Sequence, residues 1–493
     1  MDRKQPKKDL SPFVFLDPSG KRWPRLRMTL LLLGVAIFLS VVWFIQALFV
    51  RPELRLPSSV RKLKGQLKAL QQQQNAQPQN PAKLAPWQKF YPKSQAAVER
   101  IAKLREQLHE NPQKKISEIR LGFCVADDQD SYQSLEKHAS QLTHVCTDWL
   151  TVIDGTGTLH AEEDLRVEKL AASKGLILMP MLDNLVENTW KPEAVENLAT
   201  GPADRQNKFI ITLLSRLEEA KAGGVVIDLE QLDPVYQKQI SDFLKKIADA
   251  LHAVDKQLWL VVPMGDEMRA YDLETLSDSV DYFIAQLFDE NSNTDDPGPI
   301  ASQDWLEGWL ALISSYGNPD QWIGTIGAYG YDWSSGSKKA EVISFSDAMS
   351  RASYAGTKKV ELQGPSYNPL FSYQEPAGNH TVCFLDAITF LNHLRAIRSE
   401  KLGGIAINKL GTEDPGIWDV LGFKDAQNLN PAAVNRLKLM KSSDTVTNVG
   451  QGEIVTVDDT QDNGFRDVKL DSTNRYTATY DGTDPDPAKG FPT

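Results

Sequence analysis

The chain has 493 residues, of which 41% are hydrophobic and 24% are charged, and its formal net charge at pH 7 is −11. This composition is typical of a globular protein, and the length allows one large folded domain with additional segments. The acidic net charge, together with the lack of a basic stripe with interleaved aromatic residues, argues against a nucleic-acid partner.

Residues 28–50 are apolar throughout, apart from small residues, Thr29, Ser40 and Gln46. A bilayer span needs about 20 such residues, whereas a signal-peptide core is shorter, and no A-x-A-like cleavage site follows. The stretch predicts an uncleaved, single-pass transmembrane helix. Eight Lys and Arg residues precede it; six follow closely, so the positive-inside rule favours, by a small margin, a cytoplasmic basic tail at residues 1–27. We therefore expect an inner-membrane protein whose bulk lies on the extracytoplasmic, periplasmic side.

Residues 51–115 are predicted to form a stalk. Much of this segment is rich in Gln, Asn and Pro, and such a composition offers little apolar surface to bury. Residues 94–109 carry apolar side chains at helical spacing, which predicts one short helix leading into the folded body.

From residue 116 to residue 423, short apolar runs alternate with amphipathic stretches. The predicted strands are 120–125, 144–153, 176–182, 225–230, 258–262, 282–288, 322–329 and 404–408. The predicted helices include 133–142, 203–221, 234–254, 305–315 and 385–399. Eight strands alternating with helices over about 300 residues indicate an α/β fold of the (β/α)8 TIM-barrel type. A doubly wound open sheet is the alternative, although no Gly-rich phosphate turn follows the first strand.

Residues 424–493 differ in character from the predicted barrel. They are polar, with strand-like runs at 453–457 and 476–480, which predicts a small β-rich appendage or a linker. Residues 481–486 resemble a calcium loop only weakly and lack its final Glu, so a solvated turn is expected. The three cysteines, Cys124, Cys146 and Cys383, have no metal-type spacing. We predict no metal and no cofactor. Cys124 and Cys146 either form a disulfide or are free cysteines within apolar strands.

The fourth predicted strand ends in two carboxylates, Asp228 and Glu230. Residues two apart in a strand point to the same side, so these two share a face with Val226. An acidic pair at the end of a barrel strand is where α/β barrels place their chemistry. The alternative is that the pair caps the next helix, because Pro234 soon follows.

Residues 223–230 resemble the fourth-strand signature D-G-x-D-x-D-x-E of glycoside hydrolase family 18, the chitinase family. The likeness extends to the family 18 domain of membrane-anchored bacterial hybrids, in which that domain precedes a polysaccharide deacetylase and a glycosyltransferase. Further segments that carry it are 15–20, 120–123, 296–303, 329–333 and 411–418. The resemblance covers roughly residues 11–50 and 116–490, implies a TIM barrel, and implies deacetylase and glycosyltransferase domains or proteins as partners, with this chain stopping just short of a deacetylase.

The resemblance also implies roles for three carboxylates. Family 18 enzymes hydrolyse β-linked N-acetylglucosamine polymers with retention, and the acetamide oxygen of the substrate attacks the anomeric carbon. Glu230 matches the general acid, which requires a pKa raised by burial and a nearby like charge. Asp228 would supply that charge and steady the acetamide, and Asp289 matches the aspartate of the sixth-strand M-x-Y-D motif.

Other positions depart from the family pattern. The earlier aspartates of the strand motif fall at Gly223 and Val226, and the tyrosine of M-x-Y-D falls at Phe288. That tyrosine donates a hydrogen bond to the acetamide, and loss of one such donor can cost about 10²–10³ in rate. The tryptophan on which the sugar ring packs in the family corresponds to Asn408 in this chain. An amide cannot replace roughly 150–250 Å² of aromatic surface.

Five further residues are candidates for the sugar groove. Tyr331, Trp333 and Trp418 are either groove-lining or core aromatics. Glu413 and Asp414 are either ligands at the rim or helix caps.

Two functions follow from these observations. The first is a membrane-anchored glycoside hydrolase or transglycosidase that acts on an extracytoplasmic β-linked amino-sugar polysaccharide. The second is a catalytically impaired barrel that binds or guides polysaccharide, or spaces the domains of a synthesis protein. A scaffold without glycan contact leaves the acidic pair unexplained.

Overall fold

The computed structural model describes residues 118–422, apart from positions 317, 358, 363 and 377, and residues 467–481. The predicted basic tail, transmembrane helix and stalk lie outside these residues, as do the predicted strand 453–457 and most of the predicted turn 481–486. Within the described part of the chain, no helix combines the length and the apolar character that crossing a membrane requires.

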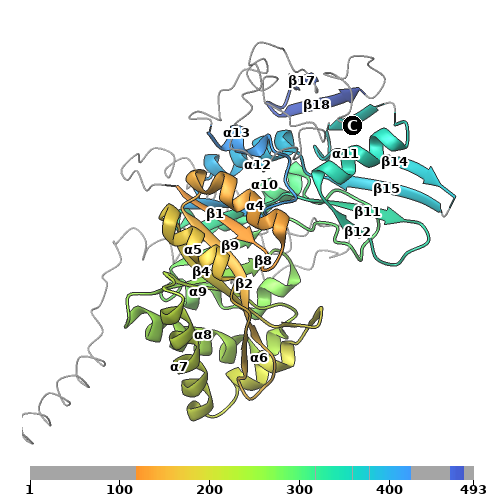
Figure 1. Ribbon diagram of the computed structural model, residues 1–493. Coiled ribbons are helices and arrows are strands. Elements are labelled where there is room, and N and C mark those ends of the chain that lie inside the picture. Colours follow the sequence, from red (N-terminus) through yellow and green to blue (C-terminus); the bar gives the residue numbers. More distant parts are fainter. Residues whose placement is uncertain are drawn as a thin grey trace, which may run out of the picture. The chain divides into compact units, whose positions relative to one another are not determined.

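Eight parallel strands close into a barrel (Figure 1). In chain order they are β1 (Ile119–Cys124), β2 (His144–Val152), β4 (Ile177–Asp183), β7 (Gly224–Asp228), β8 (Gln257–Pro263), β9 (Tyr282–Gln286), β10 (Trp322–Gly327) and β16 (Gly404–Asn408). The barrel is closed because β1 pairs with both β2 and β16. The predicted TIM barrel is therefore confirmed, each predicted strand overlaps one of these, and the open-sheet alternative is wrong.

The strands form because their apolar residues alternate between two cores. One core fills the barrel and takes residues from every strand of it, Val226 among them. The other lies between the barrel and its helices and includes Val225, Ile227 and Leu229. β7 is therefore apolar on both faces, as expected for a parallel strand covered on both sides. Val226, at the position of a family aspartate, is fully buried inside the barrel.

Helices and short turns surround the barrel. They are α4 (Gln129–His138), η3 (Ala139–Gln141), α5 (Leu165–Lys174), α6 (Pro192–Ala199), α7 (Ala203–Glu219), η4 (Pro234–Tyr236), α8 (Gln237–His252), η5 (Asp266–Ala270), α9 (Leu273–Leu276), α10 (Gln303–Ser315), η6 (Pro319–Gln321), α12 (Ala387–Ser399) and α13 (Ile417–Gly422). The predicted helix 234–254 divides into η4 and α8. Three small strands also lie here, namely β3 (Leu159–Ala161), antiparallel to β2, and the hairpin β5 (Leu185–Val186) and β6 (Thr189–Trp190).

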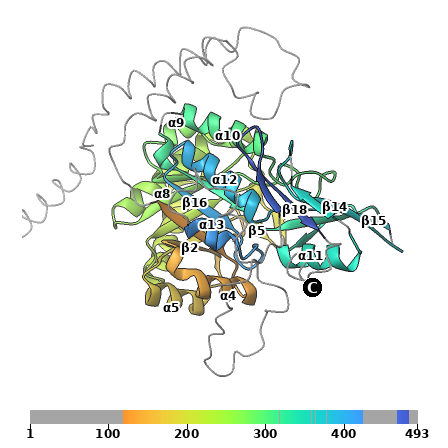
Figure 2. The same ribbon diagram turned by 90° about the horizontal axis from the view of Figure 1, so that it is seen from above.

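A second, antiparallel sheet is inserted between β10 and β16 and lies beside the barrel (Figures 1 and 2). Its strands are β11 (Gly330–Ser334), β12 (Glu341–Ile343), β13 (Lys359–Leu362), β14 (Leu370–Glu375) and β15 (Gly378–Phe384), together with helix α11 (Phe345–Tyr354). The C-terminal hairpin of β17 (Asp467–Leu470) and β18 (Tyr476–Asp481) extends this sheet, because β18 pairs with β13. The predicted strand 476–480 is confirmed as β18, and it joins the inserted sheet.

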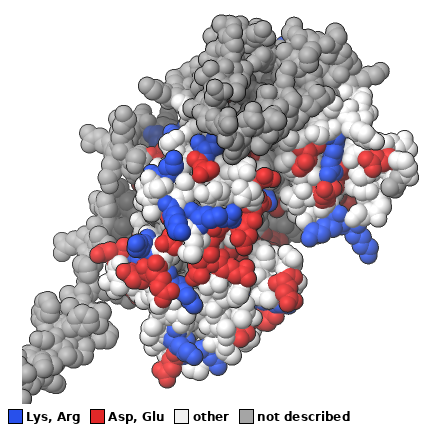
Figure 3. Space-filling view, in the orientation of Figure 1, with Lys and Arg blue, Asp and Glu red and all other residues white. Residues whose placement is uncertain are grey.

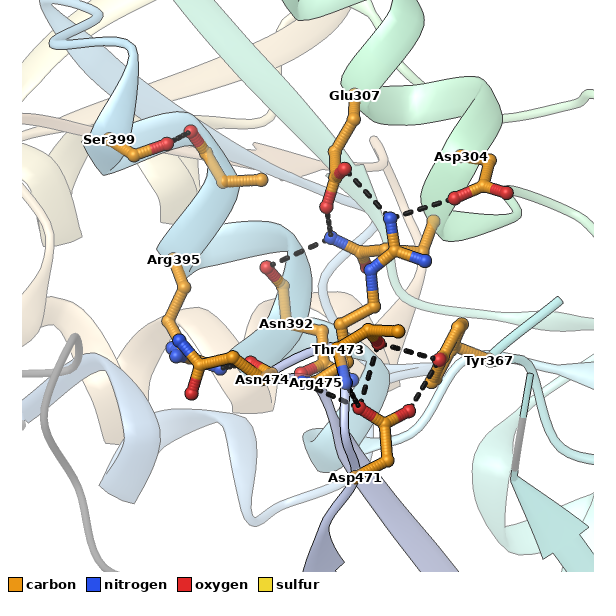
Figure 4. A network of polar contacts seen from close by, with 12 residues as sticks. Asp304, Glu307, Tyr367, Asn392, Arg395, Ser399, Asp471, Thr473, Asn474 and Arg475 are labelled. Atoms are coloured by element: carbon orange, nitrogen blue, oxygen red, sulfur yellow. Dashed lines mark hydrogen bonds and ion pairs between the residues drawn. The ribbon is translucent and has the colours of Figure 1, made fainter. Parts of the chain in front are cut away.

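Polar contacts hold the C-terminal hairpin against α10 and α12 (Figure 4). The buried Asn392 amide donates to the Tyr476 carbonyl at 2.8 Å and accepts from the Tyr476 N–H at 2.9 Å. The Arg475 guanidinium lies 2.7 Å from the Asp304 carboxylate and 2.8 Å from that of Glu307. The hairpin is therefore an integral part of the folded body.

All three cysteines are free and buried, so Cys124 and Cys146 do not form a disulfide.

Candidate active site

The carboxylates of the fourth predicted strand lie at the carboxyl end of the barrel. Asp228 is the last residue of β7, and Glu230 follows two residues later. Both side chains are only partly buried, whereas Leu229 between them packs into the outer core. The alternation expected of a strand thus holds Asp228 and Glu230 toward the barrel mouth.

The surroundings of Glu230 favour its protonated form. Burial is the largest cause that raises the pKa of Glu230 to about 10, followed by the charge of Asp228, a hydrogen bond to Glu267 and the charges of Glu267 and Asp289. Burial also raises the pKa of Asp228 to about 7, with further contributions from Asp183 and Glu267. Crowded carboxyl groups share protons because they cannot all be ionised. Glu230 can therefore act as an acid at neutral pH.

Glu267 is a site residue that the sequence analysis did not identify. It lies in η5, directly after β8, and its carboxyl is hydrogen-bonded to that of Glu230. The signal in the sequence is the acidic pair Asp266-Glu267. It follows the fifth predicted strand, in the same way that Asp228 and Glu230 stand at the end of the fourth.

Asp289 is held by two tyrosines. Its carboxylate accepts a hydrogen bond of 2.5 Å from the Tyr329 hydroxyl and one of 2.9 Å from the Tyr331 hydroxyl. Burial raises the pKa of Asp289, although both hydrogen bonds act in the opposite direction. The structure thus brings Asp289, Tyr331 and Glu230 to one site. Tyr329, which precedes the insertion, was not among the predicted site residues.

Aromatic rings continue from this site onto the inserted sheet. The rings of Phe288 and Tyr329 are 6.1 Å apart, those of Tyr329 and Tyr331 are 5.4 Å apart, and those of Tyr331 and Trp333 are 5.4 Å apart. Trp333 is 7% exposed and Tyr331 is 4% exposed. These contacts favour the core alternative for Trp333, whereas the hydroxyl of Tyr331 reaches Asp289.

Asn408 ends β16 at the same end of the barrel. It lies beside Gly327 of β10, and its carbonyl accepts from the Ala328 N–H at 2.7 Å. The side chain of Asn408 is partly exposed, and Lys409 follows it. The position expected to hold a tryptophan is therefore at the barrel mouth, but it carries an amide.

Glu413 and Asp414 make contacts typical of structural groups. Glu413 accepts from Ser134, from the Gly411 N–H at 2.5 Å and from the Trp418 indole at 3.1 Å. Asp414 is fully buried and accepts from the backbone N–H groups of residues 387 and 416 at 2.9 and 2.8 Å. Trp418 is buried and stacks on His138 at 4.2 Å. These contacts favour the capping and core alternatives.

Acidic side chains are prominent on the surface of the described body. On the face shown in Figure 3, Asp and Glu side chains gather in the middle, with Lys and Arg side chains beside them. Among the residues that the structure describes, no three His, Cys, Asp or Glu side chains are arranged to hold a metal ion.

Comparison with known proteins relates this geometry to glycosidases. The chain is 20% identical over 316 residues to the uncharacterized glycosylase YvbX of Bacillus subtilis. This match covers 62% of this chain and 91% of that protein. It is 22% identical over 277 residues to the cortical fragment-lytic enzyme of Bacillus anthracis, covering 54% of this chain and 64% of that one.

Solved structures share the fold. A chitinase from Chromobacterium violaceum is 21% identical with a TM-score of 0.57, and the match covers 64% of this chain and all of that chain. The spore cortex-lytic enzyme SleL of Bacillus megaterium is 19% identical with a TM-score of 0.58, and the match covers 63% of this chain and 74% of that chain. The family model "Glycosyl hydrolases family 18" matches residues 121–413, more than half of the chain. The chain therefore belongs to glycosyl hydrolase family 18.

Proposed function

We propose that the barrel is a glycoside hydrolase that cleaves a β-linked, N-acetylglucosamine-type polysaccharide with Glu230 as its general acid. The observation that carries this proposal is the position of Glu230 beside Asp228 at the carboxyl end of β7, where burial and neighbouring carboxylates raise the pKa of Glu230. Membership of family 18 supports it, as do relatives whose names describe glycosylases, chitinases and cortex-lytic enzymes.

The reaction needs two events that these residues can support. Glu230 gives its proton to the glycosidic oxygen as the bond to the anomeric carbon breaks. The acetamide oxygen of the substrate attacks that carbon, and Asp228 offsets the positive charge that develops on the acetamide. Water then opens the cyclic intermediate while Glu230 recovers its proton. Asp289, oriented by Tyr329 and Tyr331, would complete the polar wall of the site.

A second function is favoured by specific departures from the family pattern. Val226 is buried in the barrel core, Phe288 lacks a hydroxyl and Asn408 lacks an aromatic ring. A barrel with these changes would bind or guide a polysaccharide without cleaving it.

We also propose that residues 28–50 anchor the protein in the inner membrane, with the barrel on the periplasmic side. The apolar length of this stretch and the basic residues before it support the anchor. The resemblance to hybrid synthesis proteins supports deacetylase and glycosyltransferase partners.

The test is to incubate the full chain in detergent with N-acetylglucosamine oligomers and with partly deacetylated oligomers. The wild type and the exposed control E219Q are expected to shorten the oligomers, and E230Q is expected to leave them intact. Binding without cleavage by all three proteins would overturn the hydrolase and support the second function. Equal cleavage by E230Q would overturn the role of Glu230.

A further inference from the structure

Asp183 lies directly beside Asp228 on the neighbouring strand. β4 and β7 are parallel, and Asp183 and Asp228 are register partners at their carboxyl ends. Neighbouring strands are about 4.8 Å apart, and side chains at paired positions point to the same side. Asp183 is 6% exposed and accepts from the Leu185 N–H at 3.2 Å. The carboxyl of Asp183 therefore lies on the same face as that of Asp228, near enough for its charge to raise the pKa of Asp228.

Asn184, the next residue, holds the backbone of Glu230. Its side-chain amide donates to the Glu230 carbonyl at 3.1 Å, and its side-chain oxygen accepts from the Glu230 N–H at 3.0 Å. Asn184 is completely buried. A fully buried amide that satisfies both backbone groups of one residue leaves that residue little freedom to move.

The strand of Asp228 cannot supply a supporting carboxylate. Two residues earlier on the same face stands Val226, which packs inside the barrel. A carboxylate behind Asp228, on the side away from Glu230, must therefore come from another element.

We propose that Asp183 and Asn184 are the positioning residues of this site, Asp183 sharing one proton with Asp228 across the two strands and Asn184 fixing Glu230 toward the substrate. This inference rests on the proposed function. Asp183 thereby supplies, from the neighbouring strand, a carboxylate near Asp228 where the family motif has an aspartate at the position of Val226.

Charge balance explains what this proton relay between Asp183 and Asp228 does. The Asp183–Asp228 pair carries one proton and one negative charge. As positive charge develops on the acetamide, the proton moves from Asp228 to Asp183, so that Asp228 becomes the ionised partner that faces the acetamide. The proton returns when the intermediate is hydrolysed, and no charge enters or leaves the pair.

Burial favours such sharing. It raises the pKa of Asp183 to about 6; hydrogen bonds from Thr151 and from the Leu185 N–H oppose this rise, and the charge of Asp148 adds to it. Other titratable groups lie close enough to interact electrostatically with Asp183 or Asp228. They belong to β2, to the end of β7 and to the segment after β8, and they are Asp148, Cys146, Glu230, Glu267 and Tyr271.

The test uses carbon NMR of the full chain labelled with ¹³C at aspartate carboxyl groups, which does not require activity. In the wild type, Asp228 is expected to titrate near neutral pH. In D183N, the titration of Asp228 is expected to move down by about one pH unit or more, because a neighbouring like charge is removed. In D228N, Asp183 is expected to keep titrating near pH 6, because a neutral amide stands where the protonated Asp228 stood. The control D281N, directly before β9 at the opposite end of the barrel, is expected to leave the Asp228 titration unchanged.

Activity gives a second readout. In D183N, the acidic limb of the kcat–pH profile should move to lower pH. In N184A, kcat should fall at least tenfold with little change in KM. An unchanged Asp228 titration in folded D183N would overturn the relay. An N184A variant with normal kcat would overturn the role of Asn184. If the NMR shifts occur but no oligomer is cleaved, the relay stands and the proposed hydrolase fails.

Discussion

At the scale of single residues, the chemistry of this site depends on which carboxyl group holds a proton. Glu230 keeps its proton because burial and three neighbouring carboxylates all oppose its ionisation. Only Glu267 among these neighbours is hydrogen-bonded to it. Glu267 therefore adds to the effects of burial and of Asp228 in raising the pKa of Glu230.

Replacing Glu267 by Gln tests this effect. The change removes a like charge next to Glu230 and lowers the pKa of Glu230, so the alkaline limb of the kcat/KM profile is expected to move to lower pH by about one unit or more. D266N, which changes the exposed neighbouring residue, is the matched control and should leave the limb in place. An unchanged alkaline limb in E267Q would show that the hydrogen bond does not govern the acid.

The hydroxyl missing at Phe288 gives a second residue-scale prediction. Its ring is only partly buried and lies edge-on to Tyr329, beside the site. If the barrel is active, F288Y restores a donor to the acetamide, and kcat is expected to rise about tenfold or more. A steady-state assay on N-acetylglucosamine oligomers measures it, and an unchanged or lower kcat would contradict the role inferred for this position.

Sequence analysis predicted Asp228, Glu230 and Asp289 as site residues, because each matches a strand-end motif of the family that the chain resembles. Asp183, Asn184 and Glu267 were missed because their importance depends on contacts between the ends of neighbouring strands. Asp183 directly follows the predicted strand 176–182, so its location at the barrel mouth was available from the strand order. Its pairing with Asp228 required the register of β4 and β7.

At the scale of elements, the inserted sheet and the C-terminal hairpin form one structure. Val468, Tyr476 and Tyr480 are at most 2% exposed, and the Tyr480 hydroxyl donates to Asp386 at the start of α12. A chain cut at residue 423 would lose this packing. We therefore expect residues 467–481 to be required for a stable barrel.

The variant N392A tests the attachment of the hairpin. It leaves the N–H and the carbonyl of Tyr476 buried without their partner, which is expected to lower the free energy of unfolding by roughly 2–4 kcal/mol. Denaturant unfolding followed by circular dichroism measures the change. N379A, at an exposed position of β15, should differ little from the wild type, and equal stability of the two variants would contradict this account.

The eight barrel strands were predictable because apolar runs recur with helices between them. The strands between β10 and β16 were not predicted; β11, for example, carries the buried, ion-paired Asp332 among its apolar residues. β13 pairs with β18, more than 100 residues further along the chain, and no local pattern predicts such a pairing.

At the scale of the whole molecule, the protonated carboxyl groups make stability depend on pH. Folding raises the pKa of Asp228 from an ordinary value of about 4 to about 7. Between these values the unfolded chain releases this proton while the folded chain retains it, so the stability that Asp228 contributes is present below pH 4 and is lost as pH rises to 7.

The variant D228N should remove this part of the pH dependence. Its melting temperature is expected to fall less than that of the wild type between pH 4 and pH 7, because no proton at this position is released on unfolding. D249N, which changes an exposed residue of α8, should follow the wild-type profile. A D228N profile parallel to the wild type would contradict the raised pKa.

The most direct test of the central claim follows the first product by proton NMR while the full chain acts on N-acetylglucosamine oligomers. Substrate-assisted hydrolysis with Glu230 as the acid predicts that the β-anomer appears first, that fully deacetylated oligomers resist cleavage, and that E230Q forms no product. Release of the α-anomer first, cleavage of fully deacetylated oligomers, or the absence of any cleavage by the wild type would contradict it.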